Sequence, residues 1–274
     1  MKVGVHLPQF GRAAGPDSIR RAAVQAEELG FEDVWVSDHL AVPDGAPYPP
    51  AFLYEPVITL TWAGAATSRV GLGSTVLILP YRHPIHLAKE LASLDQLSGG
   101  RVLLGAGVGW LEGEFDALGV PFHDRGRRTG EYLDAIRACW SDDPASYSGR
   151  TVSFGGMKVR PKPAHPIPIW LGGSSERALA RAVAKADGWH GNVAPDVAAP
   201  IVKMLRSERQ DESFTLSMRT SWDGVGTPVA DIEREAEAFA GLGIQHVVAV
   251  PAQPDLDNWL RSVETVGKVL APYR

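Results

Sequence analysis

The sequence predicts a single (β/α)8 barrel, on the basis of chain length, strand pattern and a repeated local plan. The 274 residues match the size of one such barrel, which is typically about 250 residues. Short and almost continuously apolar segments alternate with helical patterns, as expected for parallel strands that are covered on both faces. A plan of helix, Leu-Gly and strand appears as AEELGFEDVWV and again as AFAGLGIQHVVAV near the other end. We therefore expect one barrel domain over residues 1–274.

Eight segments qualify as barrel strands because each is a short apolar run bounded by turn residues. After the first of them, a helical pattern runs from Asp17 to Leu29, and Gly30 gives it a C-terminal stop. The eight are Val3 to Leu7, Val34 to Val36, Val70 to Leu79, Arg101 to Gly105, Ile167 to Leu171, Gly188 to His190, Phe214 to Arg219 and His246 to Val250. Eight parallel crossovers favour a closed barrel, and an open doubly wound sheet is the alternative.

Two segments interrupt the alternation of strands and helices. Residues 41–56 contain five prolines and form a long loop after the second strand. Residues 144–168 alternate apolar and polar side chains around Gly149 and Gly155. This pattern predicts a small β-hairpin inserted before the fifth strand. Neither segment has the composition of a linker between domains.

Charge and hydropathy exclude several classes of partner. The formal net charge of −5 gives no electrostatic reason to expect binding to nucleic acid or to an anionic membrane. No apolar stretch approaches the roughly 20 residues that span a bilayer. The N-terminal MKVGVHLPQF lacks the apolar run and cleavage site of a signal peptide. We therefore expect a cytoplasmic protein that acts on a small molecule.

In a barrel of this kind, the residues at the C-terminal ends of the strands line the active site. The most specific of these segments is IWLGGSSERALARAV, in which a strand leads through two glycines and two serines into a helix. Such a helix N-terminus binds phosphate readily, and an ordinary serine cap is the alternative. The GAGVGW run matches no dinucleotide fingerprint, so its glycines serve either cofactor contact or barrel packing. The resulting candidates for cofactor contact are Ser74, Thr75, Gly107, Gly109, Gly172, Gly173, Ser174 and Ser175.

Histidine and aspartate side chains also occur at strand ends, which raises the question of a metal. Metal sites need several ligands that converge with set spacing. The first strand offers one histidine, His6, rather than a His-x-His pair. We expect no metal site, and a metal-dependent hydrolase or isomerase barrel is a remote alternative. The side chains concerned are His6, Asp38, His39, His190 and His246.

Longer motifs resemble a known family. The block LPYRHPIHLAKELASLDQLSGGRVLLGAGVGWLEGEFDALGV, followed by PIPIWLGGSS and ADGWHG, resembles the bacterial luciferase-like flavin monooxygenase superfamily. The resemblance covers nearly the whole chain and is closest to the branch that uses the deazaflavin coenzyme F-420. It implies a (β/α)8 barrel with an insertion, and often a homodimer.

The resemblance also implies roles for individual residues. Asp38 and His39 match a pair beside the (deaza)flavin ring. Ser74 and Thr75 match a bulge in the third strand that backs the ring and often contains a non-prolyl cis peptide. The segment Gly172 to Ser175 matches the loop whose backbone binds the cofactor phosphate.

One position departs from the family pattern. The deazaflavin-dependent sugar-phosphate dehydrogenases of this superfamily have a catalytic glutamate where this chain has Trp110, so their reaction does not transfer. Glu112 and Glu114 cannot simply replace that glutamate. We expect Trp110, with Tyr48 and Phe52, to form an apolar wall for the substrate. Arg82 meets either the acidic tail of the cofactor, an acidic substrate, or solvent.

These inferences predict an oxidoreductase that transfers hydride between coenzyme F-420 and a small organic substrate. The cofactor performs the hydride chemistry, and the protein orients it and excludes water. His39 is the expected proton donor or acceptor, because an imidazole titrates near neutral pH. Asp38 is expected to orient His39 or to hydrogen-bond the ring. The alternative is an FMN-dependent monooxygenase that uses reduced flavin and oxygen.

Overall fold

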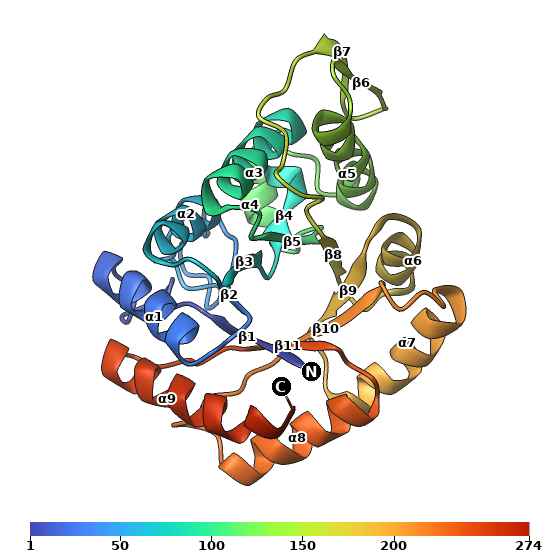
Figure 1. Cartoon of the computed structure of the whole chain (residues 1–274). Helices are drawn as coiled ribbons and strands as arrows, with labels where there is room; N and C mark the ends of the chain where they lie inside the picture. The colour runs from blue at the N-terminus through green and yellow to red at the C-terminus, as the bar shows by residue number, and fades with distance from the viewer. Residues whose placement is uncertain (274) are drawn as a thin grey trace.

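The structure is a computed structural model that describes residues 1–273. Its centre is a closed ring of parallel strands, and helices surround the ring (Figure 1). Pairing of β11 with β1 and of β3 with β5 closes the ring, so the predicted (β/α)8 barrel is confirmed. In chain order the ring strands are β1 (Lys2–His6), β2 (Asp33–Val36), β3 (Gly71–Ser74), β5 (Val102–Gly107), β8 (Ile169–Gly172), β9 (Gly188–Gly191), β10 (Thr215–Arg219) and β11 (His246–Ala249).

Each ring strand is followed by a helix that covers the outside of the barrel. Four of these helices, α1, α2, α3 and α7, begin with proline, which has no N–H to lose in the first turn. None of the helices within residues 1–273 combines the length and apolarity that a bilayer crossing requires. The helices are α1 (Pro16–Glu28), α2 (Pro56–Ala66), α3 (Pro84–Ser98), α4 (Glu112–Ala117), α5 (Arg125–Ser141), α6 (Glu176–Lys185), α7 (Pro195–Glu208), α8 (Val229–Gly241) and α9 (Leu256–Val269), with short 3-10 turns η1 (Leu79–Tyr81) and η2 (Ala271–Tyr273).

The third strand differs from the expectation of one continuous segment from Val70 to Leu79. It is divided into β3 and the two-residue β4 (Leu77–Ile78), and the peptide between Thr75 and Val76 is cis. Gly73 pairs with Leu103, and Leu77 pairs with Ala106. The third strand thus advances four residues between these two pairs while β5 advances three. The extra residue defines a β-bulge. Both the bulge and the cis peptide agree with what the family resemblance implies.

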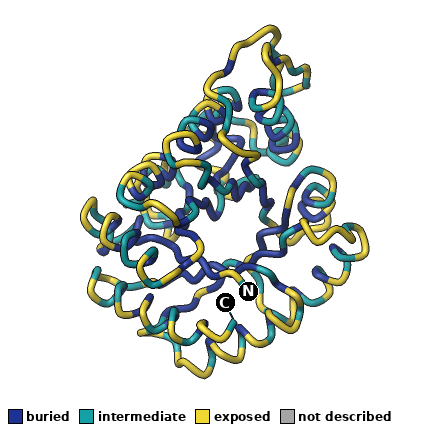
Figure 2. The backbone as a smooth tube through the Cα atoms, in the orientation of Figure 1, coloured by how far each residue is buried: buried dark blue, intermediate teal, exposed yellow. Residues whose placement is uncertain are grey.

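The predicted hairpin before the fifth ring strand is confirmed. It consists of β6 (Ala145–Ser148) and β7 (Ser153–Met157), which pair antiparallel. The hairpin projects beyond α5 at the edge of the molecule, away from the ring (Figure 1). Most of its surface is exposed, in contrast to the buried ring strands (Figure 2). The insertion therefore leaves the strand ends of the barrel open.

Aromatic side chains fill the interior of the ring. The indole of Trp35 stacks on His190 with ring centroids 5.1 Å apart, and on Trp170 at 5.6 Å. A Cβ atom on Gly73 would lie 2.5 Å from the Trp35 ring, which explains why this strand position is glycine. The barrel is thus packed through its centre, and a ligand has space only at the strand ends.

Candidate active site

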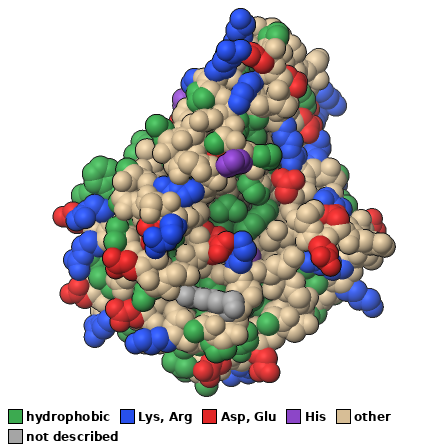
Figure 3. All heavy atoms as spheres, viewed as in Figure 1, with side chains coloured by type: hydrophobic (Ala, Val, Ile, Leu, Met, Phe, Trp, Pro, Cys, Tyr) green, Lys and Arg blue, Asp and Glu red, His purple; other side chains and the backbone are tan. Residues whose placement is uncertain are grey.

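A cavity of about 350 Å³ lies at the C-terminal ends of the ring strands. This volume falls in the range of small-molecule sites, about 300–1,000 Å³. A larger hollow of about 890 Å³ lies at the opposite, N-terminal end of the barrel, the end seen in Figure 3. We assign the site to the smaller cavity because catalysis in this fold takes place at the C-terminal face. The predicted residues that line it are Asp38, His39, Thr75, Gly107, Gly109, Gly172, Gly173 and Ser174.

The bulge of the third strand forms one wall of the cavity. Thr75 and Val76 both face it. A Cβ atom on Gly107 would lie 2.5 Å from Val76 Cγ2, and one on Gly172 would lie 3.3 Å from Val76 Cγ1. These two glycines therefore make room for Val76, so barrel packing suffices to explain Gly107. Ser74 lies behind this wall, fully buried, and its hydroxyl donates to the carbonyl of Gly105 at 2.8 Å.

The glycine-serine loop leads from β8 into α6. Gly173 has a φ of 106°, a conformation that favours glycine, and its carbonyl accepts a hydrogen bond from the Trp189 indole at 2.9 Å. Ser174 lines the cavity. Ser175 lies outside the lining and caps α6, because its hydroxyl accepts from the amide of Ala178 at 3.3 Å. The two serines are thus separated in position, with one facing the cavity and one capping the helix.

His39 forms its side-chain hydrogen bond with Glu114 rather than with its neighbour in sequence. The Nδ1–Oε2 distance is 2.7 Å, and the Glu114 side chain is fully buried. The hydroxyl of Tyr81 donates to the same carboxylate at 2.8 Å, and the amides of Leu40 and Ala41 donate to its other oxygen. Since a carboxylate only accepts, Nδ1 of His39 bears a proton. Within residues 1–273 nothing hydrogen-bonds to Nε2, which is left for a ligand.

The surroundings of Glu114 favour its ionised form. Burial alone raises the pKa of this carboxyl, but hydrogen bonds from His39, the amides of Ala41 and Leu40, and Tyr81 outweigh it and lower the pKa. The pKa of the Tyr81 phenol is raised, first by burial and then by the adjacent Glu114. Tyr81 is therefore a neutral donor beside a carboxylate. Sequence reasoning set Glu114 aside as a catalytic replacement and did not identify it as the partner of His39.

Of the two roles expected for Asp38, orienting His39 is contradicted by the structure, whereas a hydrogen bond to the cofactor ring stays a prediction. Asp38 is buried and both of its oxygens are engaged by Arg82, at 2.6 and 2.9 Å, while the amide of Ile78 donates to it at 2.8 Å. Burial raises the pKa of Asp38, and the Arg82 guanidinium opposes that rise. Arg82 also donates to Glu55 at 2.8 Å, so it is not free for a cofactor tail, a substrate or solvent. The bidentate pair instead fixes the end of β2 against β4.

A chain of hydrogen bonds leads from the cavity into the barrel core. Thr75 Oγ1 lies 2.8 Å from His190 Nε2, His190 Nδ1 lies 2.8 Å from Ser217 Oγ, and Ser217 Oγ lies 2.8 Å from His246 Nδ1. His246 Nε2 lies 3.0 Å from Asp33 Oδ1. Because the Asp33 carboxylate only accepts, Nε2 of His246 bears a proton, and the protonation of His246 Nδ1 sets the direction of the remaining bonds. The chain ends at the Thr75 hydroxyl, which lines the cavity.

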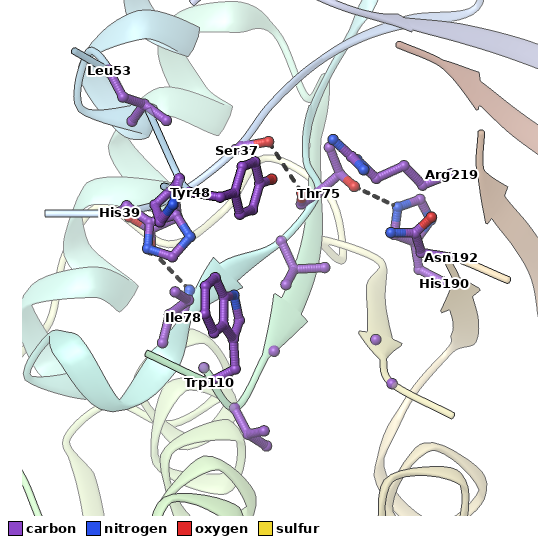
Figure 4. A pocket seen from close by; sticks show the side chains of 18 of the residues that line it. Ser37, His39, Tyr48, Leu53, Thr75, Ile78, Trp110, His190, Asn192 and Arg219 are labelled. Carbon is purple, nitrogen blue, oxygen red and sulfur yellow. Dashed lines mark hydrogen bonds between the residues drawn. The ribbon is translucent and has the colours of Figure 1, made fainter. Parts of the chain in front are cut away.

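Aromatic rings cover part of the cavity. Tyr48 and Trp110 stack with centroids 6.1 Å apart and an interplanar angle of 12°, and His39 lies at the edge of the same indole (Figure 4). Both rings line the cavity, as expected for an apolar wall. Phe52 does not line the cavity and packs against Tyr54 instead.

The loop that contributes Tyr48 is fixed at both ends. At its start, the amides of Leu40 and Ala41 bind Glu114. At its end, Arg82 binds Glu55, and the Gln9 amide donates to the carbonyl of Tyr54 at 2.5 Å. Between these anchors, four residues line the cavity, namely Tyr48, Pro49, Pro50 and Leu53.

The histidines that raised the question of a metal are engaged elsewhere. His6 bonds to the carbonyl of Leu7 at 2.7 Å and to Ser37 at 2.8 Å, while His190 and His246 belong to the chain described above. Over residues 1–273, no three or more His, Cys, Asp or Glu side chains gather as a metal site would require.

A (β/α)8 barrel with a small-molecule cavity at the carboxyl ends of its strands has the architecture of a barrel enzyme. Residues 1–242 match the family described as Luciferase-like monooxygenase, and the chain belongs to this family. Family relatives of this chain are oxidoreductases and monooxygenases that depend on coenzyme F-420 or on FMN.

Among the individual relatives, one depends on F-420 and another on FMNH2. An uncharacterized protein of Mycobacterium tuberculosis is 39% identical over 61% of this chain and 65% of its own length. The F-420-dependent glucose-6-phosphate dehydrogenase of Kineococcus radiotolerans is 32% identical over 64% of this chain and 52% of its own length. The FMNH2-dependent dimethylsulfone monooxygenase of Pseudomonas fluorescens is 34% identical over 64% of this chain and 48% of its own length. This chain thus matches about half to two thirds of these three relatives.

Solved structures agree with the fold. An F-420-dependent secondary alcohol dehydrogenase covers 98% of this chain, and this chain covers 98% of it, with a TM-score of 0.81 at 20% identity. The F-420-dependent tetrahydromethanopterin reductase of Methanopyrus kandleri gives 99% coverage of both chains, a TM-score of 0.80 and 20% identity. At this identity, the likeness concerns the fold alone.

Proposed function

We propose that this protein transfers hydride between the deazaflavin coenzyme F-420 and a small organic substrate. The observation on which the proposal rests is that one cavity is lined by the bulge at Thr75, by His39 and by Ser174 of the glycine-serine loop. Relatives that use F-420 support this choice of cofactor.

The lining residues fit a cofactor of this class. The bulge offers the Thr75 hydroxyl as a hydrogen-bonding group for a polar ring edge. Gly173 and Ser174 lie just before α6, and a helix N-terminus favours phosphate. The bound deazaflavin supplies the carbon that gives or takes the hydride, which is the chemistry of the cofactor.

The side chains of this protein orient the reactants and manage a proton. We assign proton donation or acceptance to Nε2 of His39, the ring nitrogen that no described residue occupies. Glu114 fixes the ring through Nδ1, and Asp38 with Arg82 positions the adjacent backbone. Tyr48 and Trp110 form an apolar wall on this side of the cavity.

An FMN-dependent monooxygenase is the second candidate. The dimethylsulfone monooxygenase relative depends on FMNH2, and its identity of 34% is close to the 32% of the F-420-dependent relative. Reduced flavin would then react with oxygen in the same cavity. A homodimer and a cytoplasmic location stay predictions for either candidate.

The test is a binding titration of the purified protein with F-420 and with FMN, followed by turnover with each cofactor. The Ser174→Asp variant adds a negative charge where the phosphate is expected, and Ser207→Asp on the exposed face of α7 is the matched control. We expect tight F-420 binding that Ser174→Asp weakens about 10-fold or more and Ser207→Asp does not, since one repelled charge is worth at least about 1.4 kcal/mol at a confined site. Preference for FMN with oxygen consumption would favour the second candidate. Binding of neither cofactor would refute both.

A further inference from the structure

Arg219 lies at the end of β10 with its side chain at the cavity, beside Thr75 and His190 (Figure 4). Its guanidinium has no hydrogen bond or ion pair with any side chain or backbone group of residues 1–273. Its Nε atom is buried without a partner. The protein therefore presents an unpaired cation to the cavity.

The other ionisable groups near Arg219 do not neutralise it. Asp38 lines the same cavity but is fully engaged by Arg82. The pKa of His6 and of His190 is lowered to about 3, first by burial, with the positive charge of Arg219 contributing in the same direction. Both histidines are therefore neutral near pH 7, and Arg219 is left with an uncompensated positive charge.

Two other half-buried arginines of this chain, Arg82 and Arg101, each have several partners. Arg82 forms ion pairs with Asp38 and Glu55. Arg101 donates to five acceptors, which are the Thr67 hydroxyl and the carbonyls of Gly64, Thr67, Val70 and Ser98. A buried charge without partners is strongly unfavourable, so a structural arginine is expected to have them. Arg219 lacks such partners, as does Arg181 in α6 within residues 1–273, but of these two only Arg219 lines the cavity, where a ligand can supply them.

We propose that Arg219 recognises an anionic oxygen group, of the carboxylate or sulfonate type, on the molecule bound in this cavity. A planar guanidinium matches such groups with two parallel hydrogen bonds. Under the proposed function, which this inference extends, the group belongs to the organic substrate, and the negatively charged part of the cofactor is the other source. The substrate class would then be small organic acids rather than neutral alcohols or ketones.

The experiment compares anions with neutral molecules of the same shape. Benzoate and benzenesulfonate are titrated against benzamide and benzenesulfonamide, with the fluorescence of Trp110 and the other tryptophans as the signal. The protein is used as wild type, as Arg219→Gln and as the surface control Arg137→Gln. We expect the wild type to prefer the anions about 10-fold or more, in line with a hydrogen-bonded charge pair. We expect Arg219→Gln to lose that preference and Arg137→Gln to keep it.

A second measurement does not depend on any ligand. Without ligand, Arg219→Gln should melt at the same temperature as the wild type or higher, because an uncompensated buried charge is removed. Equal binding of anions and neutral molecules by the wild type would overturn the proposal. So would an unchanged preference in Arg219→Gln, or a lowered melting temperature showing that Arg219 stabilises the empty fold.

Saturating the protein with cofactor identifies the source of the anion. If anions still bind, and still require Arg219, the group belongs to the substrate. If the cofactor displaces them and Arg219→Gln weakens cofactor binding, the group belongs to the cofactor. If anions bind through Arg219 while neither F-420 nor FMN binds, the proposed function fails and the role of Arg219 remains supported.

Discussion

Glu114 accepts four hydrogen bonds, two from side chains and two from backbone amides, and so determines how His39 is held. The carboxylate keeps the proton on Nδ1 and turns Nε2 into the working nitrogen. It lies 75 residues further along the chain than His39. Glu114 is therefore a positioning residue in our scheme, and His39 is the catalytic residue.

The variant His39→Asn separates the hydrogen bond to Glu114 from the proton transfer at Nε2. The asparagine amide can still donate to Glu114, but nothing replaces Nε2. We expect turnover to fall by about 100-fold or more, as for loss of a general acid or base. Cofactor affinity and melting temperature should stay close to wild type. Equal turnover in wild type and His39→Asn would contradict the assignment of the proton to this ring.

Glu114→Gln tests the positioning role, with the exposed Glu112→Gln as its control. The amide turns one acceptor oxygen into a donor that faces other donors, so unfolding should become easier by about 1–3 kcal/mol. The folded pKa of Glu114 is lowered, so its contribution is present above the unfolded pKa and is lost as pH falls through the folded value. Denaturant titrations should therefore show a smaller stability loss on acidification in Glu114→Gln. The pH profile of kcat should also shift, which a purely structural role would not cause.

At the scale of elements, the bulge between β3 and β4 places the Val76 side chain against Gly107 of β5 and Gly172 of β8. The sequence VGLGSTVLILP reads as one apolar strand, because periodicity does not distinguish a strand from a bulged strand. The pairing registers with β5 are needed to show the extra residue. Only the family resemblance indicated the bulge in advance.

Gly107→Ala tests the packing of this element. The new methyl group would lie 2.5 Å from Val76 Cγ2, and overpacking of this kind typically destabilises by about 1–3 kcal/mol. Adding Val76→Ala should recover part of the loss, and a double-mutant cycle in urea measures the coupling. As a control, Gly241→Ala in α8 meets no atom within 4 Å and should stabilise by up to about 1 kcal/mol. Additive effects of Gly107→Ala and Val76→Ala would show that the two positions are not in contact.

At the scale of the whole molecule, buried neutral histidines link stability to pH. The pKa of His6 and His190 is lowered to about 3, whereas an unfolded histidine titrates near about 6.5. The unfolded chain thus binds more protons between these values. The stability that these neutral histidines contribute is fully present above about pH 6.5. The free energy of unfolding then decreases by up to about 1.4 kcal/mol per pH unit for each histidine as the pH drops toward 3.

Urea unfolding between pH 4 and 7 measures this slope. His190→Gln keeps one donor and one acceptor for Thr75 and Ser217 but takes up no proton, so its slope should be shallower. The exposed His86→Gln should keep the wild-type slope. An unchanged slope in His190→Gln would show that His190 is not the neutral group described.

The ring of strands and the hairpin could be predicted from local periodicity. The strand-end rule and the family resemblance together named about half of the residues that line the cavity. The sequence did not predict which side chains meet. Thr75 and His190 are 115 residues apart, and Asp33 and His246 are 213 apart. Such contacts depend on strand register and bulge geometry, which no local pattern records. The orientation of His39 toward Glu114 instead of Asp38 is the clearest example.

The loop of residues 41–55 has consequences for how the protein can change over evolutionary time. Its ends are fixed by Glu114 and Arg82, which also hold His39 and Asp38 in place. Its middle touches the cavity but takes no part in those anchors. Insertions and substitutions in the middle of the loop can therefore alter which molecules enter the cavity while His39 and Glu114 stay unchanged. An ancestral barrel with these anchors could diversify its chemistry by exchanging one loop, and an engineer could do the same by grafting.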